Sequence, residues 1–227
     1  MPKFILLDSV SSSGKSTIGK YFNGKNFLHF QIDNYFNDKR LNYEKLFKNI
    51  KNSYGETEKI YLNEPVKYMV KDAIESNKNI IFDHVSQKEI IDIMGNRKLY
   101  IIIIFTNIKN LARNIELRRK EGDRRGIFVF NQFADRYIKC SDNSSKKIEI
   151  VNREKFKKIL LKYFKYEFNS ESDLINFSND VFKKMKIKDD DDHYVKLRPE
   201  YICDYLLITT NKTKDDLFKE LKKIIIE

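Results

Sequence analysis

The residues best suited to chemistry lie near the N-terminus, and seven of them are consecutive: Ser11, Ser12, Ser13, Gly14, Lys15, Ser16 and Thr17. A loop that ends in Gly-Lys-Ser and opens a helix turns successive backbone N–H groups toward phosphate oxygens. In such a loop the lysine reaches the β- and γ-phosphates, and the serine hydroxyl joins the coordination shell of Mg²⁺. The sequence therefore predicts a nucleotide-binding loop in which Ser16 is also a metal ligand.

Gly14-Lys15-Ser16 alone is a weak signal, since a structural Ser/Gly turn would have the same residues. The context favours the functional interpretation. An apolar run at Lys3–Leu7, typical of a buried parallel strand, precedes the loop, and a helical pattern over Lys15–Phe22 follows it. Ser9 occupies the position of the first glycine in the pattern G-x-x-x-x-G-K-[ST], where a serine fits if its φ is negative.

Two aspartates follow strand-like runs, Asp33 after Phe27–Ile32 and Asp83 after Asn79–Phe82. Parallel strands present their carboxyl ends at one edge of the sheet, where open α/β proteins bind ligands. Asp33 is the candidate base that takes the proton of an attacking hydroxyl, and a helix N-cap is the alternative. Asp83 is the candidate acidic residue that holds Mg²⁺ through water, with substrate binding or a structural role as alternatives.

Five of the ten arginines lie within thirteen residues, at positions 113, 118, 119, 124 and 125. Gly122 and Gly126 flank the segment that carries Asp123, Arg124 and Arg125, as hinges would flank a lid. Cations delivered over a triphosphate stabilise the charge that develops on its oxygens. The pattern predicts that Arg118, Arg124 and Arg125 bind nucleotide and that Arg124 acts in catalysis. A basic helix face that binds water or RNA is the alternative.

These residues need a frame that brings them together, and the hydrophobic pattern predicts one of alternating strands and helices. We expect an α/β fold with a doubly wound, five-stranded parallel sheet of the P-loop kinase type and a helical insertion before the last strand. Its core would comprise residues 1–138 and 201–227, with the insertion at 139–200. Strands are expected at Lys3–Leu7, Phe27–Ile32, Asn79–Phe82, Leu99–Phe105 and Tyr205–Thr209. Helices are expected at Lys15–Phe22, Tyr43–Tyr54, Val66–Ser76, Ile108–Lys120, Asn152–Tyr166, Ser172–Met185 and Lys214–Ile225.

The composition narrows the class of protein. A chain of 227 residues can bury a sizeable core, and its longest apolar run is far shorter than the about twenty residues of a membrane helix. We expect a soluble, cytoplasmic protein. Cys140 and Cys203 lack the spacing of a disulfide framework or a zinc module, and the acidic run ending at His193 is interpreted as a solvated loop. The net charge of +11 comes mostly from scattered lysines, which weakens it as a sign of nucleic-acid binding.

The chain resembles the chloramphenicol phosphotransferase-like group of P-loop small-molecule kinases over Pro2–Ile138 and Tyr201–Glu227. The resemblance rests on the following residues: Ser11 to Ser16, Ile32-Asp33, Ile80 to Asp83, Leu117-Arg118, Gly122-Asp123-Arg124, Gly126, Asp204-Tyr205 and Thr209-Thr210. It implies that Asp33 deprotonates the substrate hydroxyl and that Gly122, Asp123 and Arg124 bind nucleotide phosphates. The stretch Ile32–Phe36 is also similar to uridine and nicotinamide riboside kinases.

Three functions fit the sequence. The first is an ATP- and Mg²⁺-dependent kinase that acts on a hydroxyl-bearing small molecule, with the insertion shaping the acceptor pocket. The second is a nucleic-acid-binding protein on a vestigial P-loop scaffold, and the third is a kinase of nucleic-acid 5′-hydroxyls. The sequence favours the first, and leaves open the acceptor, the choice between ATP and GTP, and the oligomeric state.

Overall fold

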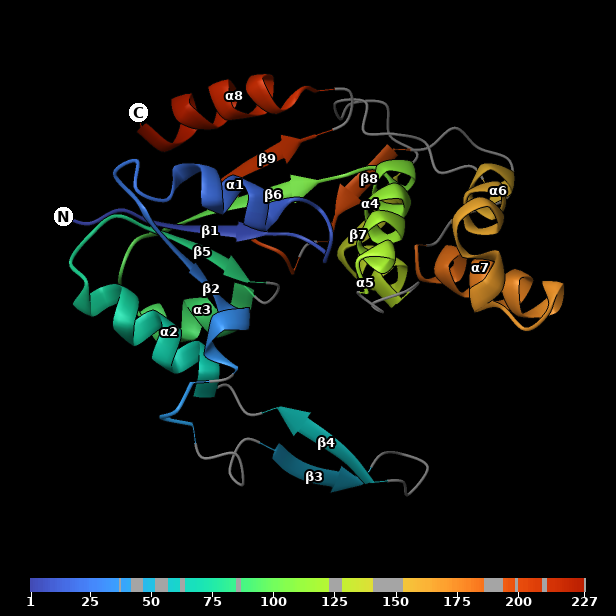
Figure 1. The fold of residues 1–227 in the computed structure, drawn as a ribbon, viewed down its shortest axis with the longest axis horizontal. Helices are drawn as coiled ribbons and strands as arrows, with labels where there is room; N and C mark the ends of the chain where they lie inside the picture. The colour runs from blue at the N-terminus through green and yellow to red at the C-terminus, as the bar shows by residue number, and fades with distance from the viewer. Residues whose placement is uncertain are drawn as a thin grey trace. The chain divides into compact units, whose positions relative to one another are not determined.

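The computed structural model describes residues 1–36, 38–41, 47–51, 57–61, 64–84, 87–122, 128–140, 153–185, 194–198, 200–209 and 212–226. Its main sheet has five parallel strands in the order β2-β5-β1-β6-β9 (Figure 1). Their bounds are β1 Phe4–Asp8, β2 Leu28–Gln31, β5 Ile80–His84, β6 Leu99–Phe105 and β9 Tyr205–Ile208. Each lies where the sequence predicts a strand, so the α/β class with helices on both faces is confirmed.

The chain divides into two compact units. The first unit comprises Met1–Asp8, Lys15–Ile103 and Cys203–Tyr205, and the second comprises Ser9–Gly14, Ile104–Ile202 and Leu206–Glu227. The candidate phosphate loop thus groups with the second unit up to Gly14, whereas Lys15 and the helix that it opens group with the first.

In the first unit, every residue of β1 and of β5 is buried. Because successive side chains of a strand point to opposite faces, both faces of these strands must be covered. Helix α1 (Lys15–Phe22) lies on one face, and α2 (Glu64–Glu75) and α3 (Gln87–Met94), which pack against each other, lie on the opposite face (Figure 1). This is the arrangement that right-handed crossovers require for this strand order.

The prediction of a helix at Tyr43–Tyr54 is wrong. Strands β3 (Phe47–Lys51) and β4 (Thr57–Tyr61) form an antiparallel hairpin there, with Phe47 opposite Tyr61. The helical signal rested on few apolar residues, and pairing with a partner rich in β-branched and aromatic residues outweighs such a local preference. Helix α3 was not anticipated, because its eight residues carry too short a pattern for periodicity to resolve.

The second unit contains α4 (Ile108–Lys120), α5 (Phe128–Arg136), α6 (Arg153–Phe164), α7 (Glu171–Lys184) and α8 (Lys214–Ile226). Antiparallel strands β7 (Tyr137–Cys140) and β8 (Tyr194–Leu197) pair within it. The expected helices at Asn152–Tyr166 and Ser172–Met185 are confirmed by α6 and α7. The buried Phe156 and Phe164 of α6 pack edge to face on Phe130 of α5, each with its ring centroid 5.6 Å away, and Phe182 of α7 packs edge to face on Phe156.

None of the helices in the described part of the chain has the length and hydropathy needed to cross a membrane.

Candidate active site

The loop Ser9–Gly14 is anchored within the second unit through its own carbonyl oxygens. Asn114 Nδ2 on α4 donates to the Ser12 carbonyl at 3.0 Å, and Thr106 Oγ1 donates to the Ser13 carbonyl at 3.1 Å. In a trans peptide the carbonyl and the following N–H point in opposite directions. The N–H groups of Ser13 and Gly14 therefore point away from these anchors, as donors to a phosphate must.

The structure explains how a serine fits at position 9. Its side chain is fully buried, and Ser9 Oγ donates to the Ile104 carbonyl at 2.5 Å. Its φ is not positive, since Ser12, Asn26 and Asn77 are the only non-glycine residues with positive φ in the described ranges. Glycine is needed instead at position 14, because Gly14 has a φ of 101°, which a residue with a side chain rarely adopts. Ser9 thus replaces the first glycine without backbone strain and adds a tether.

Two hydroxyls of the loop are buried without a hydrogen-bond partner among the described residues. Ser12 and Ser13 are only 6 % and 5 % exposed, and neither Oγ is paired. A buried polar group without a partner costs about 1–3 kcal/mol. Because a phosphate oxygen would accept from either hydroxyl, these orphaned donors fit a phosphate ligand.

In the first unit, the first turn of α1 contacts a carboxylate on β5. Ser16 Oγ donates to Asp83 Oδ2 at 2.5 Å, and Gln31 Nε2 on β2 donates to the same oxygen at 3.3 Å. Gln31 and Asp83 are register partners on neighbouring parallel strands, which explains why their side chains meet. The structure therefore brings together Ser16 and Asp83, the two residues predicted to hold Mg²⁺.

Asp83 is held as an anion. Burial raises its pKa, but the facing polar groups of His29, Lys15, Ser16 and Gln31 outweigh burial and lower the pKa to about 2. Asp83 is consequently ionised at neutral pH. Lys15 is itself buried, 6 % exposed, so the charge that acts on Asp83 is held inside the unit.

Ser16 and Asp83 form a donor set of the kind that suits Mg²⁺ in a kinase. Within the described residues, no group of three or more His, Cys, Asp and Glu side chains could hold a metal ion. Mg²⁺ in phosphotransferases commonly takes only one or two protein carboxylates and completes its shell with water and substrate phosphates. A hydroxyl and an ionised carboxylate that contact each other meet this requirement.

Asp33 lies in a different environment. It is the second residue of the 3₁₀ helix η1 (Ile32–Tyr35), and it is exposed. Gln31, and not Asp33, occupies the N-cap position of η1. The segment is fixed to α2 by Tyr35, whose hydroxyl donates to Asp72 Oδ2 at 3.1 Å, and Asp72 also pairs with Arg40. Asp33 therefore stands on an anchored turn with its carboxylate open to solvent.

Of the predicted arginine lid, the structure describes only the beginning. Arg118 lies in the last turn of α4, half-buried. Gly122 has a φ of 93° and its N–H donates to the Arg119 carbonyl, so it ends the helix in the left-handed conformation typical of a C-terminal cap. Asp123, Arg124 and Arg125 lie outside the described residues, as does the acidic run that ends at His193.

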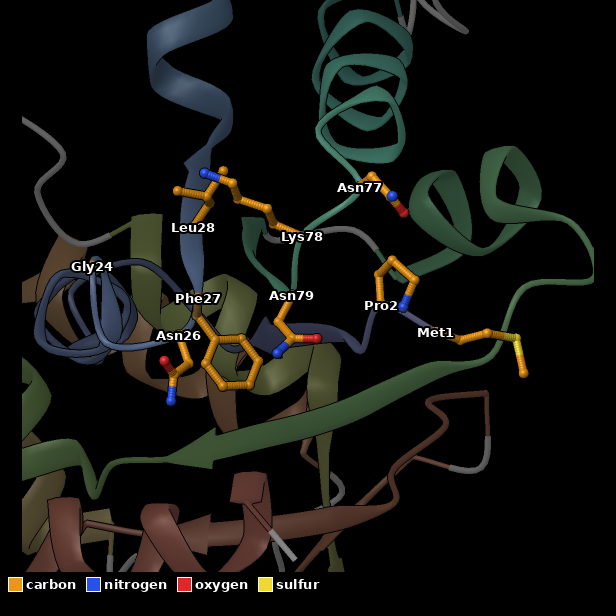
Figure 2. A pocket seen from close by; sticks show the side chains of 9 residues that line it. All are labelled: Met1, Pro2, Gly24, Asn26, Phe27, Leu28, Asn77, Lys78 and Asn79. Carbon is orange, nitrogen blue, oxygen red and sulfur yellow. The ribbon is translucent and has the colours of Figure 1, made fainter.

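A cavity of about 820 Å³ lies at the opposite edge of the first unit. Figure 2 shows its lining, which includes Pro2, Phe27 and Asn79. Each of these residues lies one or two positions before the start of β1, β2 or β5, so they mark the amino ends of the strands. Open α/β sheets bind their ligands at the carboxyl ends, so this cavity is not the candidate active site.

Sequence reasoning missed several side chains that lie next to predicted site residues within each unit. In the first unit these are His29 and Gln31, and in the second they are Thr106, Asn114 and Gln132, whose Oε1 accepts from the Ser11 N–H at 3.3 Å. For two of them a signal existed. His29 and Gln31 alternate with Leu28 and Phe30 in a strand, which puts the two polar side chains on one face and the two apolar ones on the other. The other three act across long sequence separations, which no local pattern reveals.

Comparison with known proteins adds little. No family model matches the chain, and no curated protein is similar to it. Among solved structures, a gluconokinase from Sinorhizobium meliloti 1021 is similar with a TM-score of 0.39 and 10% identity, over 81% of this chain and 97% of that chain. A likeness of this size carries no information about activity. The resemblance to chloramphenicol phosphotransferase-like kinases stays a prediction, and the function must be inferred from the side chains of the site.

Proposed function

We propose that this chain is a kinase that uses ATP and Mg²⁺ to phosphorylate a hydroxyl of a small molecule. The observation that carries the proposal is the 2.5 Å hydrogen bond from Ser16, in the first turn of α1, to the ionised Asp83. Ser16 directly follows Gly14 and Lys15, and a hydroxyl at that position that is hydrogen-bonded to a carboxylate is suited to a nucleotide-bound Mg²⁺ ion.

The phosphates would bind to the consecutive residues of the loop and the start of α1. The N–H groups of Ser13 and Gly14 and the unpaired hydroxyls of Ser12 and Ser13 supply donors, and Ser11 and Thr17 border them. Lys15 supplies a positive charge for the β- and γ-phosphates. Ser16 and Asp83 would hold Mg²⁺, the former directly and the latter through water. When bound, Mg²⁺ neutralises charge on the phosphate oxygens during transfer.

Asp33 is the proposed base. The hydroxyl oxygen of the acceptor attacks the γ-phosphorus, the bond from that phosphorus to the oxygen of ADP breaks, and the hydroxyl proton goes to the Asp33 carboxylate. The exposed position of Asp33, on a turn fixed to α2, suits a group that must meet a diffusing substrate.

The arginines after α4 complete the proposal. Arg118, Arg124 and Arg125 would bind the triphosphate, and Arg124 would stabilise the charge that develops during transfer. The core at 1–138 and 201–227 would then bind the nucleotide, while the insertion at 139–200 would shape the acceptor pocket. The acceptor remains a small molecule rather than a nucleic acid in this proposal, because the basic residues are mostly lysines scattered along the chain.

The test is transfer of labelled γ-phosphate from ATP and Mg²⁺ to a panel of small hydroxyl compounds and to a 5′-hydroxyl oligonucleotide. We expect transfer to a small compound, loss of transfer in Lys15→Ala, and no loss in Lys20→Ala, which removes an exposed lysine of the same helix. Transfer to the oligonucleotide alone would identify a 5′-hydroxyl kinase. Oligonucleotide binding without any nucleotide turnover would identify a vestigial site.

A further inference from the structure

His29 occupies the strand position next to the proposed magnesium site. It lies two residues before Gln31 on β2, so the two side chains share the face of the sheet on which Gln31 reaches Asp83. The His29 side chain is 4% exposed, and its Nε2 lies 3.8 Å from Asp83 Oδ2. That distance exceeds a hydrogen bond, and among the described residues the buried Nε2 has no hydrogen-bond partner.

The imidazole of His29 packs closely against the backbone of α1 at Gly19. A Cβ atom built on Gly19 would lie 2.1 Å from His29 Nε2, so a side chain at position 19 would force the ring to shift. A glycine inside a helix is destabilising relative to alanine. The ring therefore fills a space between helix and sheet that only a glycine at position 19 leaves open, with its Nε2 toward the carboxylate.

A buried imidazole nitrogen beside an ionised carboxylate is stabilised only as a donor. Asp83 is an anion at neutral pH and can only accept, so the favourable tautomer of His29 carries its proton on Nε2. Oδ2 of Asp83 already accepts from Ser16 and Gln31. A displacement of about 1 Å would bring His29 within hydrogen-bond distance of the same carboxylate.

We propose that His29 is a positioning residue that donates from Nε2 to Asp83 and orients this carboxylate toward nucleotide-bound Mg²⁺. The inference rests on the proposed function and extends it to a residue that lies next to the proposed metal ligand Asp83. Groups that hydrogen-bond to metal-binding side chains fix the orientation of those side chains, and losing one lowers metal affinity or activity about 10- to 100-fold.

The experiment measures cation binding rather than turnover. Mn²⁺ serves as the probe, and its binding to the full chain in the presence of ADP is followed by electron paramagnetic resonance. ADP binding in EDTA is measured alongside by calorimetry. His29→Phe keeps a ring but removes the donor, and we expect it to weaken Mn²⁺ binding about 10- to 100-fold with metal-free ADP binding unchanged. His29→Gln restores an amide donor near the position of Nε2 and should recover most of the affinity.

Each outcome has one meaning. If the unsubstituted protein binds neither ADP nor Mn²⁺ with ADP, the proposed function fails. If it binds both and His29→Phe binds Mn²⁺ equally well, only the role of His29 is overturned. If His29→Gln is as weak as His29→Phe, restoring a donor does not restore Mn²⁺ binding, and the inference is again wrong.

Gly19 gives an independent route that leaves His29 in the chain. Gly19→Ala forces the imidazole out of its present position, so it should weaken Mn²⁺ binding as His29→Phe does. In a His29→Ala background the added methyl group meets no ring, and Gly19→Ala should then have little effect. Equal effects of Gly19→Ala in both backgrounds would show that the two residues are not coupled and would overturn the proposed geometry.

Discussion

Two aspartates lie at the carboxyl ends of neighbouring strands of the same sheet, yet their environments are opposite. Asp83 on β5 is buried, accepts hydrogen bonds from Ser16 and Gln31, and has its pKa lowered to about 2. Asp33, after β2, is exposed on a short 3₁₀ helix. A carboxylate that holds a cation must stay ionised and oriented, whereas one that takes up a proton must be reachable. The difference between the two environments matches the two roles that we propose.

The sharpest test of this comparison is Asp33→Asn. An amide cannot take up the hydroxyl proton, so kcat for phosphotransfer should fall about 10²- to 10⁴-fold, the usual contribution of a positioned base. Because Asp33 has no place in nucleotide binding, the affinity for ATP and Mg²⁺ should not change. Single-turnover kinetics and calorimetry measure the two quantities separately. Retention of full kcat would remove Asp33 from the mechanism.

Asp83→Asn should act in the opposite way. The amide can still accept from Ser16 but carries no charge, so binding of Mg²⁺ with nucleotide should weaken by about 10- to 100-fold. Raising the Mg²⁺ concentration should restore much of the activity, as it should not for Asp33→Asn. A titration of activity against Mg²⁺ distinguishes the two variants. Identical Mg²⁺ dependence in both would erase the distinction between the two carboxylates.

The sequence predicts where the two aspartates lie in the sheet better than it predicts which side chains surround them. The five strands are visible as apolar runs, and the parallel order brings Asp33 and Asp83 to one sheet edge, so their shared location follows from pattern alone. The hydrogen bonds of Asp83 do not follow from any pattern, because Gln31, Ser16 and Asp83 are far apart in the chain and meet only through strand register and the packing of α1.

The same limit explains the errors in the fold. The hairpin of β3 and β4 depends on pairing between two segments, and neither segment shows the pairing alone. Lysines are mostly exposed, yet Lys15 is buried close enough to Asp83 to influence its pKa. Burial of a charged residue depends on its partner, and the partner is known only once the fold is.

Stabilisation by bound ligand should also differ between Asp33→Asn and Asp83→Asn, and this effect should be smaller than the effects on activity. At a ligand concentration of 100 Kd, ATP with Mg²⁺ should stabilise the protein by about 2.7 kcal/mol. Thermal denaturation should show the same upward shift in Tm for the unsubstituted protein and for Asp33→Asn, and a smaller one for Asp83→Asn at the same ligand concentration. An unsubstituted protein whose Tm does not respond to ATP and Mg²⁺ would contradict nucleotide binding altogether.

The smallest expected effect is on stability in acid, and it requires no ligand. The pKa of Asp83 is about 2 in the folded protein, against an ordinary value of 3.8. A carboxyl whose folded pKa is lowered contributes stability that is present above its unfolded pKa and lost as pH falls toward its folded pKa. The shift corresponds to about 2 kcal/mol at neutral pH.

Urea unfolding should therefore find Asp83→Asn less stable than the unsubstituted protein at pH 6, with the difference shrinking as pH falls from about 4 to about 2. Asp33→Asn is the matched control, because an exposed carboxylate in no hydrogen bond of the described structure should leave the acid dependence unchanged. A constant stability difference for Asp83→Asn across this range would mean that Asp83 is not held as an anion by its neighbours.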